Sequence, residues 1–379
     1  MTDSPPFPDD KALTDEQRYG AGLAALGAAP GTLRKFLDGY QPAQAWQAIA
    51  RGRHRADPDC RYRRKAVPAT LDTVVAGVLH SGVSIHVLGG PDYPSALAQD
   101  RQVPAVLFST GDVAALEGLP RAAVVGTRAA TVYGLGVASE LGRGLARAGV
   151  VVVSGMTPGI DAAAHAGALG ADAGAPTVGV LGTAHDAVAT GSQVALRAAL
   201  GARGAVLSEI PPAVHSAPWW FAARNRVMAA LAHVVVVVEC HHRGGSLHTV
   251  SAALARGATV AAVPGSVRSP ASAGTNRLLV EGAVPVRDVD DVLTAVELAV
   301  VGRPDIRPPG PPPAPGRCTV GSSPPGPLAP WHRRVQRALG QDPATLEAVV
   351  RRSGLALGDV SVALEALAEA GLAECEHGW

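Results

Sequence analysis

The sequence has few aromatic residues, few lysines and no closely spaced cysteines. Aromatic residues make up 4% of the 379 residues, so the core must be built mainly from Ala, Val and Leu. The absence of any CxxC pair argues against a metal site or a disulfide framework and fits a reducing cytosol. We therefore expect neither metal nor cofactor. The cysteines are Cys60, Cys240, Cys318 and Cys375.

Long apolar runs are also missing. The longest aliphatic run, at residues 234–238, is far too short to span a bilayer. The first ten residues, MTDSPPFPDD, have neither the positive nor the apolar region of a secretory signal. These features lead us to expect a cytoplasmic protein without membrane contact.

Composition changes along the chain predict four regions. Residues 1–70 are expected to form a helical N-terminal domain, with Thr14 capping its first helix and breaks at Pro30-Gly31 and Pro42. Residues 71–301 are expected to form a Rossmann-like domain. A Pro-rich linker at 302–330 leads to a winged-helix-like module at 331–379. We expect helices in this module at 331–340, 344–352 and 358–370.

Short Val- and Ala-rich segments dominate the predicted Rossmann-like region. Strands this apolar are buried on both faces, as in a parallel sheet covered by helices. The gaps between them are long enough for crossover helices, for example at 132–148 and 246–256. The fold class is therefore α/β, a doubly wound Rossmann-like parallel sheet. The candidate strands are 122–126, 149–154, 176–181, 204–208, 233–238 and 258–263.

Small or polar residues follow nearly every candidate strand. In an open α/β sheet, ligands bind where the carboxyl ends of the strands point. Glycine allows the backbone to approach a ligand closely, and helix N-termini offer free N–H groups to a phosphate. These turns together predict a ligand-binding edge. They are Gly126-Thr127-Arg128, Ser154-Gly155, Gly182-Thr183, Ser208-Glu209, Glu239 and Pro264-Gly265.

Two predicted helix starts at this edge allow two interpretations each. Asp161 and His165 share one helix face, which suits an acid–base pair, a metal pair, or a first-turn Asp beside a structural His. One Asp and one His are too few for a metal site, which favours the structural interpretation. The turn at 244–249, GGSLHT, could cradle a phosphate or be a plain tight turn.

Positive charge is concentrated locally although the net charge is +1. Six arginines between 224 and 277 stand against one acid, Glu239, which is typical of polyanion binding. Trp219-Trp220-Phe221 precedes Arg224-Asn225-Arg226, so aromatic rings either stack on bases or pack a loop against the core. Residues 51–65 contain seven Arg or Lys and two Asp. This run of charge could be a phosphate-contacting strip or a solvated loop.

These segments resemble the DNA-processing A (DprA/Smf) family. VVGTRAATVYG (124–134) resembles its VGSRxxSxYG signature, and SGMTPGIDAAAHAGAL (154–169) resembles SGLARGIDxxAHxxAL. The match spans roughly residues 74–290, and the predicted domain layout is also similar. Further blocks in the family's order are GGPDYPSAL (89–97), PAVLFSTGD (104–112), TVGVLGTAHD (177–186), LSEIPP (207–212), FAARNRVMAAL (221–231), GGSLHTVSAALARGATVAAVPG (244–265) and GTNRLLVEGA (274–283).

The resemblance implies a protein that binds and protects single-stranded DNA and is not an enzyme. It also implies a homodimer that helps load the RecA recombinase onto DNA during natural transformation. Arg128 is expected to hold phosphate, Phe221 to lie against a base, and Arg224 and Arg226 to line the pocket. The full set of expected DNA contacts is Gly126, Thr127, Arg128, Ser154, Gly155, Gly159, Phe221, Arg224, Asn225, Arg226, Gly245, Ser246, Thr249 and Asn276.

The sequence departs from the family pattern at two places, and alternatives stay open. Pro158 stands where the family usually has Arg, and residues 189–193 read ATGSQ instead of YPxxN, so DNA affinity could be weakened or the pocket repurposed. A nucleotide hydrolase of the related LOG superfamily needs a Glu where this chain has Ala252. A non-catalytic nucleotide sensor also fits. An NAD dehydrogenase does not, because no GxGxxG follows the first strand.

The predicted C-terminal module is acidic. Residues 341–379 contain two Arg and seven acids, and the third predicted helix carries Asp359, Glu365 and Glu369 without a cation. Such a face would repel a phosphate backbone, so we expect this module to contact protein rather than DNA. Its core-facing stripe is expected to be Val360, Ala363, Leu364 and Leu367.

Overall fold

The chain divides into two compact units, Met1–Ala314 and Pro315–Trp379, which are treated separately. In a computed structural model, the residues described are 13–301, 306, 310, 330–339, 346–355, 360, 363, 364 and 367. None of the helices in these ranges is both long and apolar enough to cross a membrane.

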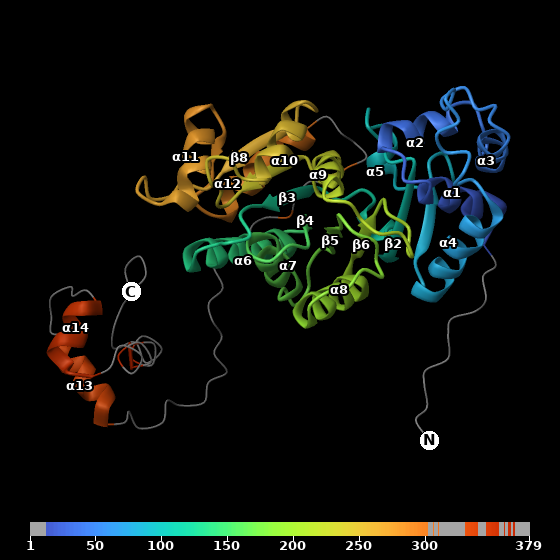
Figure 1. Cartoon of the computed structure of the whole chain (residues 1–379). Helices are drawn as coiled ribbons and strands as arrows, with labels where there is room; N and C mark the ends of the chain where they lie inside the picture. The colour runs from blue at the N-terminus through green and yellow to red at the C-terminus, as the bar shows by residue number, and fades with distance from the viewer. Residues whose placement is uncertain are drawn as a thin grey trace, which may run out of the picture. The chain divides into compact units, whose positions relative to one another are not determined.

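A nine-stranded sheet runs through the first unit in the order β1-β2-β6-β5-β4-β3-β7-β8-β9 (Figure 1). The strands from β6 to β9 in this order pair in parallel, whereas β2 pairs antiparallel with both β1 and β6. The strands are β1 Ser84–Val87, β2 Val106–Gly111, β3 Arg121–Val125, β4 Val151–Gly155, β5 Thr177–Val180, β6 Ala205–Ser208, β7 Val234–Val237, β8 Thr259–Ala262 and β9 Val284–Pro285.

The prediction of a doubly wound Rossmann-like sheet is confirmed. Each of the six strands expected from the sequence is present, with ends within two residues of those predicted. The sequence analysis did not identify β1, β2 and β9. These strands lack the uniform aliphatic pattern: β1 contains His86, and β9 has two residues that are both exposed.

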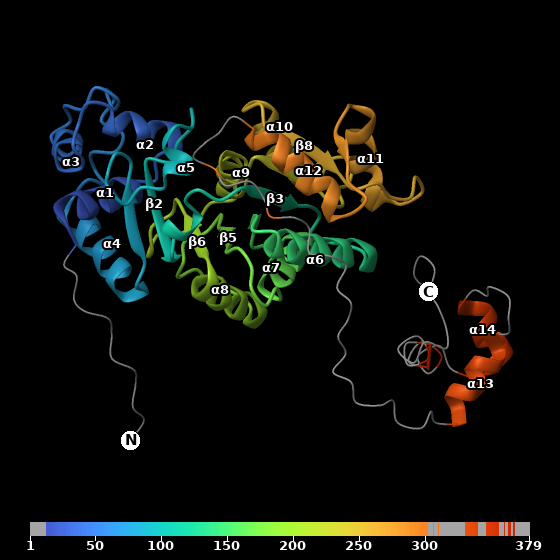
Figure 2. The ribbon, with the colours of Figure 1, turned by 180° about the vertical axis from the view of Figure 1, so that it is seen from behind.

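Helices cover both faces of the sheet, as Figures 1 and 2 show. Along β3, Val124 packs with α6, α7 and α12 on one face, and Val125 packs with α9, α10 and α11 on the other. Alternate residues of each buried strand therefore serve opposite halves of the core. The helices are α5 Ser95–Ala98, α6 Val132–Arg147, α7 Ile160–Leu169, α8 Gly191–Arg203, α9 Trp219–Leu231, α10 Ser246–Leu254, α11 Ala273–Val280 and α12 Val289–Val300, with 3-10 turns η1 Ala114–Leu116 and η2 Pro270–Ser272.

Four helices precede the sheet: α1 Asp15–Ala25, α2 Pro30–Leu37, α3 Pro42–Ala50 and α4 Pro68–Ser81. The predicted cap is confirmed, because the Thr14 hydroxyl accepts a hydrogen bond from Gln17 N at 3.2 Å. Pro30 and Pro42 are the first residues of their helices, where a missing N–H costs nothing. The predicted breaks are thus helix starts. These helices share a core with β1 and β2 that includes Phe36 and Phe108.

The second unit contains α13 Pro330–Leu339 and α14 Leu346–Ser353. The expected core stripe of the third predicted helix is confirmed at its described positions, which are buried with Val335 and Val349. These positions are Val360, Ala363, Leu364 and Leu367. The other residues of that helix, and all of the predicted linker 302–330 except 306, 310 and 330, lie outside the described residues.

Candidate functional site

A cavity of about 500 Å³ lies at the carboxyl ends of β3 and β7, between α9 and α10. Nine of the fourteen predicted contact residues line it: Gly126, Thr127, Arg128, Phe221, Arg224, Asn225, Gly245, Ser246 and Thr249. The structure thus gathers these residues from three separate sequence blocks around one space. Five predicted residues do not line the cavity: Ser154, Gly155, Gly159, Arg226 and Asn276.

Arg128 and Phe221 form the exposed part of the cavity wall. The Arg128 guanidinium carbon lies 5.6 Å from the centroid of the Phe221 ring, which is 37% exposed. A cation over an aromatic face at this distance is a favourable cation–π contact. The ring approaches the backbone closely, since a Cβ on Gly182 would come within 2.9 Å of it. One cation and one ring therefore stand together where a ligand could reach both.

The neighbouring tryptophans behave differently from Phe221. Trp220 is buried with Ala184 and Ile210, and Trp219 stacks on it with ring centroids 4.2 Å apart. The core-packing interpretation of this aromatic run therefore applies to Trp220. Phe221 is the member of the run that lines the cavity.

The loop that carries Arg128 is held by Glu239, the residue that follows β7. Its carboxylate accepts hydrogen bonds from Thr131 N at 2.9 Å and from the Thr131 hydroxyl at 2.6 Å. Its backbone carbonyl accepts one from Thr127 N at 2.8 Å. Glu239 is only 2% exposed. The acid that the sequence placed at the ligand edge therefore positions the Arg128 loop.

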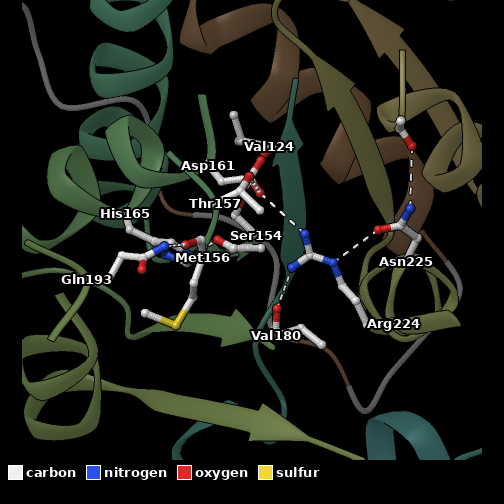
Figure 3. Close-up of polar contacts among 12 residues, drawn as sticks. Val124, Ser154, Met156, Thr157, Asp161, His165, Val180, Gln193, Arg224 and Asn225 are labelled. Atoms are coloured by element: carbon white, nitrogen blue, oxygen red, sulfur yellow. Dashed lines mark hydrogen bonds and ion pairs between the residues drawn. The ribbon is translucent and has the colours of Figure 1, made fainter. Parts of the chain in front are cut away.

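Arg224 lies beneath the cavity and is paired with Asp161 (Figure 3). The two side chains are almost fully buried, and Arg224 Nη2 lies 3.6 Å from Asp161 Oδ2. Arg224 also donates to the Val180 carbonyl and, from Nε, to Asn225 Oδ1 at 3.1 Å. Thr157 donates its hydroxyl hydrogen to Asp161 at 2.7 Å. Most of the charge that Arg224 carries is thus compensated inside the protein.

Burial shifts the pKa of both partners in the direction that favours the neutral form of each group. Loss of hydration raises the pKa of Asp161, although Arg224 and the Thr157 hydroxyl oppose that shift. The same loss lowers the pKa of Arg224, against the attraction of Asp161. The separation of 3.6 Å exceeds a direct hydrogen bond, so the attraction only partly offsets the desolvation.

Arg226 was expected to line the cavity, but in the structure it does not. Residues two apart on a helix point about 200° away from each other, so Arg224 and Arg226 cannot face the same space. Arg226 forms an ion pair with buried Glu209 and donates to the Gln102 carbonyl. Burial raises the pKa of Glu209, and Arg226 opposes this rise. Arg226 therefore joins α9 to the segments that carry Glu209 and Gln102 and does not contact the cavity.

The excess of positive charge counted along the sequence is smaller in the folded structure, because acids from other segments pair with several of these arginines. Arg256 pairs with Asp100 at 2.7 Å, and Arg277 pairs with Glu281 at 2.7 Å. Together with the pairs of Arg224 and Arg226, four of the six arginines are compensated. Within the described ranges, the exposed arginines near these loops that form no ion pair are Arg128, Arg243 and Arg268.

The other predicted residues do not line the cavity, but they fix the backbone and side chains next to it. A Cβ on Gly155 would lie 2.1 Å from Arg224 Nη1, so only glycine leaves room for the buried pair. Gly159 has φ +91° and would place a Cβ 2.4 Å from the Thr127 carbonyl. The Ser154 hydroxyl donates to the Val124 carbonyl. Asn276 hydrogen-bonds both the N–H and the carbonyl of Gly265, at 3.2 and 3.0 Å.

Asp161 and His165 are engaged separately, which supports the structural interpretation of this helix face. His165 is fully buried between the Thr177 hydroxyl at 2.8 Å and the Gly155 carbonyl at 3.0 Å. Burial lowers its pKa to about 4, so the ring is neutral near pH 7. Across the described part of the chain, no three His, Cys, Asp or Glu side chains converge to hold a metal ion.

The turn after β7 is tight and also faces the cavity. Gly244 N donates to the His241 carbonyl at 2.9 Å, and α10 begins at Ser246, whose hydroxyl donates to Cys240 Sγ at 3.0 Å. His241 and His248 line the cavity as well. His248 belongs to the GGSLHT turn that the sequence analysis marked as a possible phosphate cradle, whereas His241 was not singled out, and its place just before that turn was the available signal. The other lining residues that were not among the fourteen expected DNA contacts are Val125, Ala129, Thr157, Asp161, Pro218, Ala222, Met228, Cys240 and Gly244.

Comparison with known proteins gives consistent matches. A family model described as DNA recombination-mediator protein A matches residues 84–297, and one described as DprA winged helix domain matches residues 321–378. The putative DNA processing protein DprA of Mycobacterium tuberculosis is 42% identical over 281 residues, covering 73% of this chain and 68% of that protein. DNA processing protein DprA of Streptococcus pneumoniae is 37% identical over 205 residues, covering 54% of this chain and 71% of that protein.

Two solved structures are similar in fold and sequence. The structure of DNA processing protein A from Streptococcus pneumoniae has a TM-score of 0.63 and 30% identity, covering 73% of this chain and 97% of that one. DNA processing protein A from Helicobacter pylori has a TM-score of 0.50 and 26% identity, covering 57% of this chain and 97% of that one. The Helicobacter structure is described as giving insight into a single-stranded DNA binding mode.

Proposed function

Because the chain belongs to the DNA recombination-mediator protein A family, we propose that its cavity binds single-stranded DNA. In this proposal the chain binds and protects the strand and helps load the RecA recombinase onto it. The setting would be the cytoplasm of a bacterium that takes up DNA by natural transformation. A homodimer is part of the same proposal, by analogy with the family that the sequence resembles.

The observation that carries the proposal is the pairing of exposed Arg128 with the half-exposed ring of Phe221. A single-strand binder needs cations for the phosphates and an aromatic face for the bases, and here the two adjoin. The N-terminus of α10 opens at the same cavity and adds a partial positive charge. These features suit a phosphate and its attached base.

A non-catalytic role fits the acids around the cavity. Among the described residues that line it, Asp161 is the one carboxylate, and it is paired with Arg224. Ala252 lies on α10 where the related nucleotide hydrolases carry their catalytic Glu. No unpaired carboxylate therefore faces the cavity in the described residues, and the other titratable bases that line it are His241 and His248. The small-nucleotide sensor remains the second candidate, because the cavity of about 500 Å³ would also hold a mononucleotide.

The experiment compares Arg128→Gln with Arg143→Gln in the full chain. Both arginines are exposed and form no ion pair in the described ranges, but Arg143 lies on α6 away from the cavity lining. Binding of a labelled oligo-dT is measured by anisotropy from 50 to 300 mM salt. Loss of one phosphate contact should lower the log–log salt slope by about 0.7 in Arg128→Gln and leave it unchanged in the control.

A second variant tests the base contact. Phe221→Ala should weaken binding by about 1–3 kcal/mol with little dependence on the base, while the melting temperature stays near that of the wild type. Equal salt slopes for both arginine variants would contradict the proposed site. Tight binding of AMP that displaces the oligonucleotide stoichiometrically, together with weak binding of the strand alone, would favour the nucleotide sensor instead.

A further inference from the structure

The loop between α3 and α4 presents an unusual group of arginines. We call residues 51–66 the arginine loop. Six of its arginines are exposed, and within the described part of the chain no hydrogen bond or ion pair engages the guanidinium groups of five of them. These five are Arg51, Arg53, Arg61, Arg63 and Arg64. Of the six arginines between residues 224 and 277, by contrast, four are paired with acids.

The arginine loop is fixed by its own hydrogen bonds. The Asp57 carboxylate is buried and accepts from Arg61 N at 2.8 Å and Tyr62 N at 3.1 Å. Buried His54 hydrogen-bonds the Phe36 carbonyl at 3.1 Å and accepts from Ala56 N at 3.1 Å. One of the two acids of the loop is thereby used to hold the backbone. The cations are presented from a defined scaffold.

The two limbs of the arginine loop lie against each other. Cys60, at φ +51°, donates from Sγ to the Gly52 carbonyl at 3.6 Å. A Cβ on Gly52 would lie 3.4 Å from Arg63 Cδ, so the Arg63 side chain crosses the first limb. Arg51 and Arg53 therefore adjoin the group at 61–64. A self-repelling cluster of this kind binds a polyanion well, because the partner relieves the repulsion.

Aromatic rings accompany these cations. The Arg61 guanidinium carbon lies 5.8 Å from the Tyr62 ring centroid, and that of Arg55 lies 5.8 Å from the Tyr40 centroid. Both tyrosines are partly exposed. The planar guanidinium group of arginine can donate two hydrogen bonds to phosphate oxygens, and bases can stack on the aromatic rings beside it. The combination fits a nucleic-acid backbone better than an acidic peptide, which has no bases to stack.

We propose that the arginine loop is a second nucleic-acid contact, which binds the phosphodiester backbone separately from the cavity. Its cations come from the helical N-terminal part of the chain, far in sequence from the blocks that surround the cavity. The proposal stands without the proposed function of the cavity, since the two surfaces are changed by different substitutions. A strand long enough to contact both the cavity and the arginine loop would gain binding free energy from each contact.

The test uses the full chain with Arg63→Gln/Arg64→Gln. The matched control is Arg143→Gln/Arg147→Gln on α6, which removes the same charge from exposed residues that form no ion pair in the described ranges. Binding of labelled single-stranded and duplex oligonucleotides is measured from 50 to 200 mM salt. Two lost phosphate contacts should lower the salt slope by about 1.4 for a single strand. The affinity loss should then be about sevenfold larger at 50 mM than at 200 mM.

Each result decides the proposal. A slope change equal to that of the control, on both kinds of oligonucleotide, would overturn it. Tighter DNA binding by the loop variant would also overturn it, since removal of cations that contact the strand cannot strengthen binding. If the melting temperature falls, Arg51→Gln/Arg53→Gln takes the variant's place. If Arg128→Gln changes nothing while the loop variant lowers the slope, the cavity function fails and the arginine loop stands.

Discussion

Replacing Asp161 by Asn should lower stability and strengthen DNA binding at the same time. Asn keeps the shape of Asp and can still accept the hydroxyl hydrogen of Thr157, but it removes the charge beside Arg224. Loss of one partner from a buried ion pair costs roughly 3–5 kcal/mol, because the other charge remains buried. The pair is 3.6 Å apart, so we expect the lower end, about 3 kcal/mol.

The two consequences are measured separately. For a unit of this size each kcal/mol lowers the melting temperature by roughly 2 °C, so Asp161→Asn should melt about 6 °C below the wild type. The uncompensated charge of Arg224 then acts on the cavity that it lines. The log–log salt slope should become steeper by up to about 0.7, which makes the gain in affinity roughly threefold larger at 50 mM than at 200 mM salt.

The assay combines a thermal melt with oligo-dT anisotropy at several salt concentrations, on one preparation of each variant. Asp172→Asn is the control, since Asp172 is exposed and forms no ion pair in the described residues. It raises the net charge equally without touching Arg224. An unchanged melting temperature with an unchanged slope would refute the reasoning. Loss of binding by a stably folded Asp161→Asn would show that the carboxylate itself contacts the ligand.

Three further predictions concern buried residues. His165 has a folded-state pKa of about 4 against 6.5 for a free side chain, so stability should fall by ~3 kcal/mol as pH drops from 6.5 to 4. His165→Gln should flatten that pH profile of melting temperature, and an identical profile would argue against a neutral buried ring. Gly155→Ala should cost about 1–3 kcal/mol, because its Cβ would collide with the Arg224 guanidinium, and a wild-type melting temperature would contradict this. Arg226→Gln should lower the melting temperature by leaving Glu209 unpaired but keep the salt slope, whereas a slope lower by about 0.7 would make Arg226 a DNA contact.

The central sheet was predictable because its strands are uniformly aliphatic and lie between Ala-rich helices. β1 and β2 were not predicted, because their pattern includes polar residues whose role depends on the partner strand. His86 of β1 hydrogen-bonds the Ser109 hydroxyl of β2 at 2.8 Å. A buried histidine of this kind is stable only once its partner is in place. Sequence periodicity alone does not reveal that pairing.

The position of the candidate site was also predictable, because strand ends rich in glycine converge at one edge of a parallel sheet. Charge within the site was not. Arg226 and Arg256 are neutralised by acids that lie 17 and 156 residues away in the sequence. A window along the sequence counts the arginines and leaves out those acids. Helix geometry, which turns Arg226 away from Arg224, was the one part of this error that the sequence could have revealed.

The compensation of these arginines limits what the cavity can do alone. One exposed cation, Arg128, together with a helix N-terminus accounts for a salt slope near 0.7, whereas strand binders depend on several phosphate contacts. Pro158 adds to this deficit, since it stands where the family that the sequence resembles usually has Arg. Under the proposed function, further phosphate contacts would come from cations elsewhere on the surface. Among the described cations without an ion pair, Arg243, between two cavity-lining residues, and the arginine loop are the candidates that we favour.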